Sequence, residues 1–141
     1  MPTFLFSHLN LSFLDVGMDL EPINKNIPVV VYTHGWAGEK IFATDQLINI
    51  ASQGYLVVAL DHTGLAMFTE LPSGTIYNTG STEASTKVFD VMKEMSIDIQ
   101  DTVRHLDNLN YEINLDDVSI IGHSTGGGSA YLYCQTNKCS T

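Results

Sequence analysis

Basic residues are scarce in this chain. Lys and Arg together number 6, against 16 Asp and Glu, which gives a formal net charge of −10 over 141 residues. A protein this acidic repels phosphate backbones and anionic membrane surfaces. The composition therefore argues against nucleic acid as a partner.

Long apolar runs are also lacking. The longest, near residues 28–32 and 55–60, fall well short of the roughly 20 residues that a membrane helix needs. No basic start followed by an apolar segment is visible, so the sequence shows no signal peptide and leaves the cellular location open.

Cysteine is nearly absent. Cys134 and Cys139 are too few for a disulfide scaffold, and their spacing matches no common zinc pattern. The sequence thus indicates neither a metal site nor another cofactor. Two cysteines do not fix the compartment.

What is present suits a single folded domain. Hydrophobic residues make up 44% and charged residues 16%, which excludes a disordered chain, and the length is enough to bury a core. Three short β-branched runs, at 29–32, 56–60 and 118–121, are nearly continuous rather than alternating. Strands covered on both faces have this pattern, so we expect a parallel sheet.

Helical patterns separate these strands. One helix is expected at 44–53, with Gly54 as its C-cap. A long amphipathic helix is expected at 83–110, with a break near Ser96 left open, and a third helix follows Ser124. Strand and helix alternate, which predicts the α/β class with right-handed crossovers. Residues 70–77 suit a small hairpin or ordered loop and 78–85 an exposed segment, whereas 3–20 stay undecided between an edge strand and none.

The motif richest in chemistry is Gly122-His123-Ser124-Thr125-Gly126. This G-x-S-x-G pentapeptide follows an apolar strand and opens a helix, which is the context of a nucleophile elbow. We predict that Ser124 is the nucleophile and that the N–H of Thr125 forms half of an oxyanion hole. The chain lacks the G-x-G-x-x-G and Gly-Lys-Ser/Thr patterns here, which argues against a nucleotide site.

A second motif, His34-Gly35-Trp36, ends the first strand. In α/β-hydrolases the other oxyanion donor comes from the loop after this strand. By position, that donor is the backbone N–H of Trp36. The alternative is a plain glycine turn with Trp36 packed or exposed.

The other histidines receive weaker predictions. His123 is expected to support the elbow, because adjacent side chains on a sharp turn diverge and cannot exchange a proton. His62 is expected to belong to an ordered loop, with recruitment as a catalytic base as the alternative. Asp101 and His105, four positions apart, predict a contact on a helix surface.

Taken together, these motifs resemble the N-terminal half of an α/β-hydrolase. More narrowly, the chain is similar to platelet-activating-factor acetylhydrolase and related lipid and polyester esterases. The resemblance implies ester hydrolysis through Ser124 without a metal, with Thr125 and Trp36 at the two oxyanion-hole positions. Trp36 is bulkier than the aliphatic residue typical there, and Ala37 replaces a frequent glycine. Similar stretches are Ile27–Gly38, Gly54–Thr63, Asp98–Leu109 and Leu115–Ala130.

The resemblance also implies an incomplete catalytic domain. In the family the acid and the histidine follow the nucleophile on later strands, and no matching positions occur here. Residues 1–141 are therefore expected to form a single partial domain, a three-layer αβα half with strand order second–first–third and open sheet edges. Such edges suit self-association or a complementing chain. The expected function is hydrolysis of a small-molecule or polymeric carboxylic ester through an acyl-enzyme, and the alternative is a non-catalytic binding or assembly module.

Overall fold

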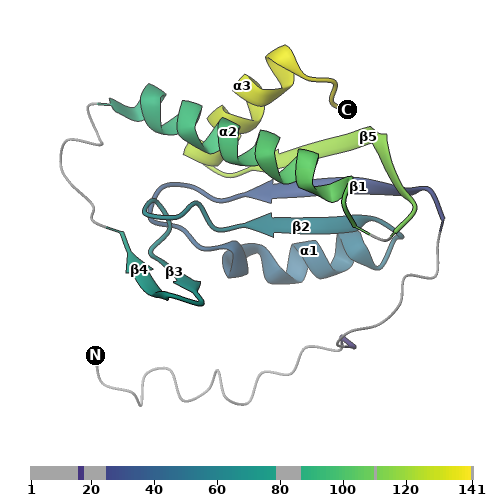
Figure 1. The fold of residues 1–141 in the computed structure, drawn as a ribbon, viewed down its shortest axis with the longest axis horizontal. Coiled ribbons are helices and arrows are strands. Elements are labelled where there is room, and N and C mark those ends of the chain that lie inside the picture. The colour runs from purple at the N-terminus through teal and green to yellow at the C-terminus, as the bar shows by residue number, and fades with distance from the viewer. Residues whose placement is uncertain (1–15, 18–24, 79–86, 110, 141) are drawn as a thin grey trace.

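A three-stranded parallel sheet forms the centre of the fold (Figure 1). The computed structural model describes residues 16–17, 25–78, 87–109 and 111–140. The strands β1 (Ile27–Thr33), β2 (Leu56–Leu60) and β5 (Ile113–Gly122) lie in the order β2-β1-β5. The predicted parallel sheet and strand order are confirmed. All three carboxyl ends consequently reach the same edge of the sheet, where sites of α/β proteins form.

Helices cover both faces of this sheet. After a 3₁₀ turn, η2 (Lys40–Ala43), helix α1 (Thr44–Ala51) packs on one face, and α2 (Val88–Leu106) and α3 (Thr125–Thr136) lie on the other (Figure 1). Helix α2 runs through Ser96 without a break. The ends of the expected long helix, at 83–86 and 110, lie outside the described residues.

Alternation along β1 divides the core in two. Val29 and Val31 point into the larger cluster with Ile99 of α2 and Tyr133 of α3, whereas Tyr32 points to the opposite face, against Leu47 of α1. Successive strand residues face opposite sides, so one apolar strand can serve both cores. The apolar run of β1 is nearly continuous because the strand is buried on both faces of the sheet.

Helices α2 and α3 approach closely at one glycine. A Cβ added to Gly128 would lie 2.5 Å from Sδ of Met92. The thioether therefore fills the space over the glycine, and this contact brings the helix that follows the elbow against α2.

The predicted hairpin is present. Strands β3 (Phe68–Leu71) and β4 (Gly74–Tyr77) pair antiparallel, and Gly74 has a φ of 130° in the turn. The hairpin lies beyond the carboxyl ends of β1 and β2 (Figure 1). Of the expected exposed segment 78–85, only Asn78 is described, and most of 3–20 also lies outside the described residues.

The sequence did not predict the connection at the end of α3. Cys134 and Cys139 form a disulfide, with their Cα atoms 5.6 Å apart. The next residue, Ser140, donates its N–H to the carbonyl of Val118 over 2.8 Å. The disulfide thus directs the chain back along the outer edge of β5. Within the described part, no helix is long and apolar enough to cross a membrane.

Candidate active site

Ser124 occupies the turn between β5 and α3 in a rare backbone conformation. Its φ is 56° and its ψ is −122°, and its side chain is exposed. Holding a non-glycine residue in such a region costs about 1–3 kcal/mol, and such strain gathers at functional sites. The fold therefore presents one hydroxyl group to solvent at the N-terminus of a helix, where the helix dipole favours negative charge.

Two glycines make this turn possible. A Cβ on Gly122 would lie 2.4 Å from the backbone of Gly126, and a Cβ on Gly126 would lie 2.3 Å from the carbonyl oxygen of Thr33. Neither space admits a side chain. The motif spacing thus follows from the close crossing of β5, α3 and β1.

Trp36 and Thr125 meet beside this turn. The backbone N–H of Trp36 donates to Oγ1 of Thr125 over 2.7 Å, across 89 positions of sequence. Thr125 is buried, with 8% of its surface exposed. The two residues predicted at the oxyanion hole are therefore neighbours. His123 lies at the same place, with Nδ1 3.2 Å from the position of a Cβ on Gly35.

The loop that carries Trp36 is anchored to the base of the hairpin. Ala37 donates its N–H to Leu65 over 2.8 Å, and the carbonyl of Gly38 accepts from Met67 over 3.0 Å. The buried carboxylate of Glu39 accepts from the N–H of Phe68 over 2.8 Å. These bonds fix the loop independently of Thr125.

His34 is buried beneath this loop as a neutral ring. Its Nδ1–H donates to the carbonyl of Gly35 over 2.6 Å, and its Nε2 accepts the backbone N–H of His62 over 3.1 Å. Burial lowers the pKa of His34 below its usual value. A ring whose Nε2 must accept cannot hold a second proton there, so the geometry and the pKa direction agree.

His62 is also buried and fully partnered. Its Nδ1 lies 2.7 Å from Oδ2 of Asp98, and its Nε2 lies 2.7 Å from Oγ1 of Thr33. Oγ1 of Thr33 lies 3.4 Å from Ser129 Oγ, which donates to Gly126. The expected ordered loop with its own hydrogen bonds is confirmed. Nε2 of His62 faces Thr33 and, within the described residues, makes no hydrogen bond to Ser124, and the alternative of His62 as base stays a prediction.

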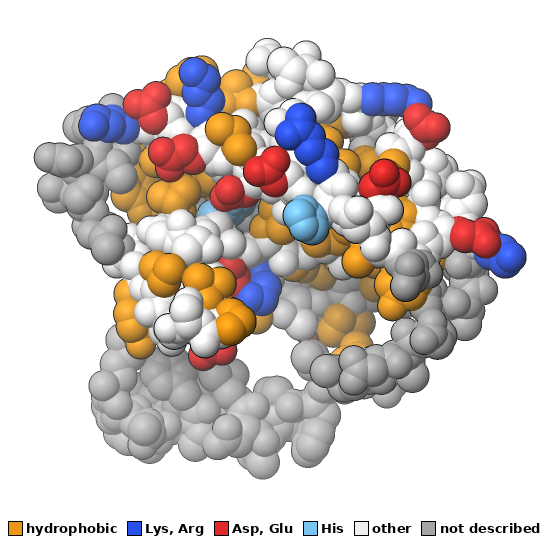
Figure 2. Space-filling view, in the orientation of Figure 1, with side chains coloured by type: hydrophobic (Ala, Val, Ile, Leu, Met, Phe, Trp, Pro, Cys, Tyr) orange, Lys and Arg blue, Asp and Glu red, His pale blue; other side chains and the backbone are white. Residues whose placement is uncertain are grey.

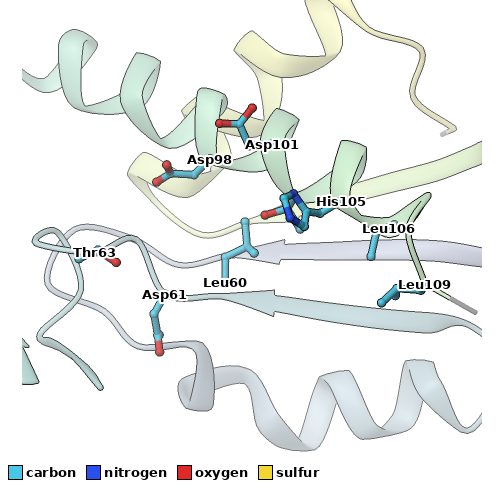
Figure 3. Close-up of a pocket in the computed structure, with 9 residues that line it drawn as sticks. Leu60, Asp61, Thr63, Asp98, Asp101, His105, Leu106 and Leu109 are labelled. Atoms are coloured by element: carbon cyan, nitrogen blue, oxygen red, sulfur yellow. The ribbon is translucent and has the colours of Figure 1, made fainter. Parts of the chain in front are cut away.

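One pocket of about 480 Å³ lies along the β2 edge, against α2. Figure 3 shows Asp98, Asp101 and His105 projecting from α2 on one side of it. The predicted contact between Asp101 and His105 is wrong: Asp101 pairs with Arg104 at 3.5 Å. The lining does not include Ser124, so this pocket is separate from the candidate site. It comprises Leu60, Asp61, Thr63, Asp98, Asp101, Thr102, His105, Leu106 and Leu109.

Charged side chains on the face of the molecule drawn in Figure 2 are dispersed. Figure 2 shows acidic and basic side chains scattered among apolar groups. One close pair joins Lys40 to Asp61, whose carboxylate also accepts the N–H of Lys40 over 2.8 Å. This pair ties η2 to the carboxyl end of β2. Within the described residues, no cluster of His, Cys, Asp and Glu has the arrangement of a metal site.

The structure thus brings Ser124, Thr125, Trp36, His34 and His123 to one end of the sheet. Within the described part of the chain, no hydrogen bond joins the Ser124 hydroxyl to a histidine ring. Sequence reasoning missed the partnership of His62 and Asp98. The available signal was weak: Asp98 follows the buried Met95 by three positions, at the margin of the buried face of α2.

Comparison with known proteins defines the class. A ferulic acid esterase from Streptomyces cinnamoneus is similar in structure, with a TM-score of 0.75 and 26% identity over 84% of this chain and 36% of that chain. No curated protein matches the chain. The fold is that of an α/β-hydrolase of esterase type, and the chain spans about a third of the esterase chain that it matches.

The family follows from the sequence itself. The chlorophyllase family model matches residues 21–138, which is most of the chain. The chain therefore belongs to the chlorophyllase family. The α/β-hydrolase resemblance is confirmed, whereas the narrower likeness to platelet-activating-factor acetylhydrolase stays a prediction.

Proposed function

We propose that this chain carries the nucleophile and oxyanion hole of a serine esterase. The observation that carries the proposal is the strained, exposed Ser124 at the start of α3, beside the Trp36 loop. Serine held in this way is the usual nucleophile of acyl-transfer enzymes on this fold. The N–H groups of Thr125 and Trp36 are the donors that would bind the oxyanion.

The reaction proceeds in two steps in this proposal. Ser124 loses its proton to a base and attacks the ester carbonyl, the alcohol leaves, and an acyl-enzyme forms. Water then releases the acid. We further propose that residues 1–141 form a partial domain and that the base and acid come from outside them, which the 36% coverage of the esterase chain supports.

The substrate class is proposed from resemblance. Lipid acyl esters and polyesters are the first candidates, and the structural similarity to a ferulic acid esterase adds esters of aromatic acids. The β3–β4 hairpin, next to the Trp36 loop, is the element proposed to line the acyl or leaving-group side. Replacing the hairpin with a short loop should change chain-length preference, and an unchanged preference would refute its role.

The direct test is hydrolysis of p-nitrophenyl acetate by the chain, with Ser124→Ala and the exposed Ser52→Ala as matched variants. Stoichiometric labelling by a fluorophosphonate should occur in the parent and in Ser52→Ala and disappear in Ser124→Ala. The oxyanion hole and substrate binding alone retain roughly 10³–10⁴-fold catalysis over water when any member of the triad is missing. Only the part of the rate that disappears in Ser124→Ala therefore reports the nucleophile. Labelling that persists unchanged in Ser124→Ala would reject Ser124 as the nucleophile, whereas no labelling in any of the three proteins would mean that Ser124 needs the base proposed to lie outside residues 1–141.

A second candidate is a binding or assembly module. Within the described sheet, β2 and β5 are the outer strands, and such edges can pair with another chain. Light scattering after size-exclusion chromatography should show a dimer or larger species if the edges associate. A monomer at high concentration would count against self-association.

A further inference from the structure

We propose that the Thr125 hydroxyl occupies the oxyanion hole of the free protein and must leave before the hole can act at full strength. This inference rests on the proposed esterase function and deepens it. It gives the side chain of Thr125 a role of its own, as a competitor for the Trp36 N–H, distinct from the role of the backbone N–H of the same residue.

This inference depends on one hydrogen-bond donor, the backbone N–H of Trp36. The N–H of Trp36 donates to Oγ1 of Thr125 over 2.7 Å. An oxyanion needs the same donor, with its nitrogen about 2.7–3.1 Å away. Two oxygen atoms can share one N–H only in a bent three-centre arrangement, in which each hydrogen bond is weaker. The hydroxyl therefore competes with an oxyanion for the best-aligned position on this N–H.

The hydroxyl is not required to place the donor. The Trp36 loop is held by the bonds of Ala37, Gly38 and Glu39 to the hairpin base. Since these anchors remain when Thr125 changes, removing the hydroxyl frees the Trp36 N–H without releasing the loop. Rotation of the Thr125 side chain about χ1 would do the same in the natural sequence.

The bond between Trp36 and Thr125 therefore makes the binding of every oxyanion less favourable. Each reaction must break or weaken this bond, and a hydrogen bond of this kind changes an equilibrium by about 5-fold. A side chain that cannot accept a hydrogen bond should therefore bind tetrahedral species more tightly. A purely structural role for the hydroxyl predicts the opposite, because a disordered loop binds them less well.

The test compares Thr125→Ala with Thr125→Ser in the same 141-residue chain. Phenylboronic acid is the probe, since it forms a tetrahedral adduct on a serine without needing a leaving group. The backbone amide of Trp36, observed by ¹H–¹⁵N NMR, reports the hydrogen bond in the unliganded state. Ser124→Ala measures binding that does not involve the nucleophile.

We expect Thr125→Ala to shift the Trp36 amide and to bind the boronate about 5-fold more tightly than the parent. Thr125→Ser keeps an acceptor and should restore both the parent amide shift and the weaker binding. Unchanged or weaker binding by Thr125→Ala, with adduct formation still dependent on Ser124, would overturn this inference and leave the esterase proposal standing. Binding that is the same in Ser124→Ala as in the parent would overturn both.

Discussion

Nδ1 of His62 lies 2.7 Å from Oδ2 of Asp98, and this contact joins the end of β2 to the middle of α2. The ring is fully buried, whereas the carboxylate is about half exposed. One helix is therefore fixed over the sheet by a polar group at its core-facing margin. The hydrogen-bonded chain continues through Thr33 and Ser129 to the first turn of α3, so the contact also bears on the elbow.

Replacement of Asp98 by Ala should lower the free energy of unfolding by about 1–2 kcal/mol. The change leaves a buried ring nitrogen without its partner, which costs about 1–3 kcal/mol, and the half-exposed carboxylate places the loss in the lower part of that range. Asp101→Ala is the matched control, because Asp101 lies one turn along and makes only an exposed pair with Arg104. Urea unfolding followed by circular dichroism measures both, and equal losses would contradict a special role for the His62 contact.

The two glycines of the α3 turn should respond very differently to alanine. Gly126→Ala forces a Cβ to 2.3 Å from the carbonyl oxygen of Thr33, whereas Gly127→Ala meets no atom nearer than 3.3 Å. We expect Gly126→Ala to cost at least about 3 kcal/mol by overpacking. Gly127→Ala should cost little, because alanine has the better helix propensity. Thermal unfolding distinguishes the two, and similar melting temperatures would show that the turn is less tightly packed than this structure indicates.

Local patterns made much of this fold predictable. The strand β2 and the G-x-S-x-G turn each consist of a short run of consecutive residues with a typical pattern. Their positions can therefore be predicted from the local sequence alone. The contact between Trp36 and Thr125 spans 89 positions and that between His62 and Asp98 spans 36. Such pairs depend on how the elements pack, which no local pattern encodes. The disulfide is local, with its cysteines only 5 positions apart, and it was missed because no spacing pattern identifies such a pair.

Backbone strain at Ser124 predicts a trade between stability and activity. Its φ of 56° and ψ of −122° suit glycine, so Ser124→Gly should raise the free energy of unfolding by about 1–3 kcal/mol. Ser124→Ala keeps a Cβ and hence the strain, and should leave stability nearly unchanged. Both variants lose the hydroxyl and any turnover that depends on it. Guanidinium unfolding of the two variants gives the comparison, and a Ser124→Gly protein no more stable than Ser124→Ala would exclude a strained turn.

Ala37, next to Trp36, has a φ of 53°, in the left-handed region that favours glycine. An alanine there costs about 1 kcal/mol relative to glycine. Ala37→Gly should therefore stabilise the protein by about that amount. Ala51→Gly, at the exposed end of α1, is the control of opposite sign and should cost up to about 1 kcal/mol. Loss of stability in both variants would indicate that flexibility of the loop outweighs relief of strain.

The buried ring of His34 predicts how stability depends on pH. Burial lowers its pKa in the folded protein, so the unfolded chain, with a pKa near 6.5, takes up a proton first as the pH falls. The contribution of His34 is thus fully present above about pH 6.5 and is lost toward acid, with a slope of at most about 1.4 kcal/mol per pH unit. The hydrogen bond to the Gly35 carbonyl opposes the lowering of the His34 pKa, His62 adds to it, and Asp61 and Glu39 oppose it. Urea unfolding between pH 7.5 and 5.5 should show a shallower loss of stability in His34→Gln than in the parent. The exposed His105→Gln should keep the parent slope, and a parent slope in His34→Gln would mean that protonation of another group controls this range.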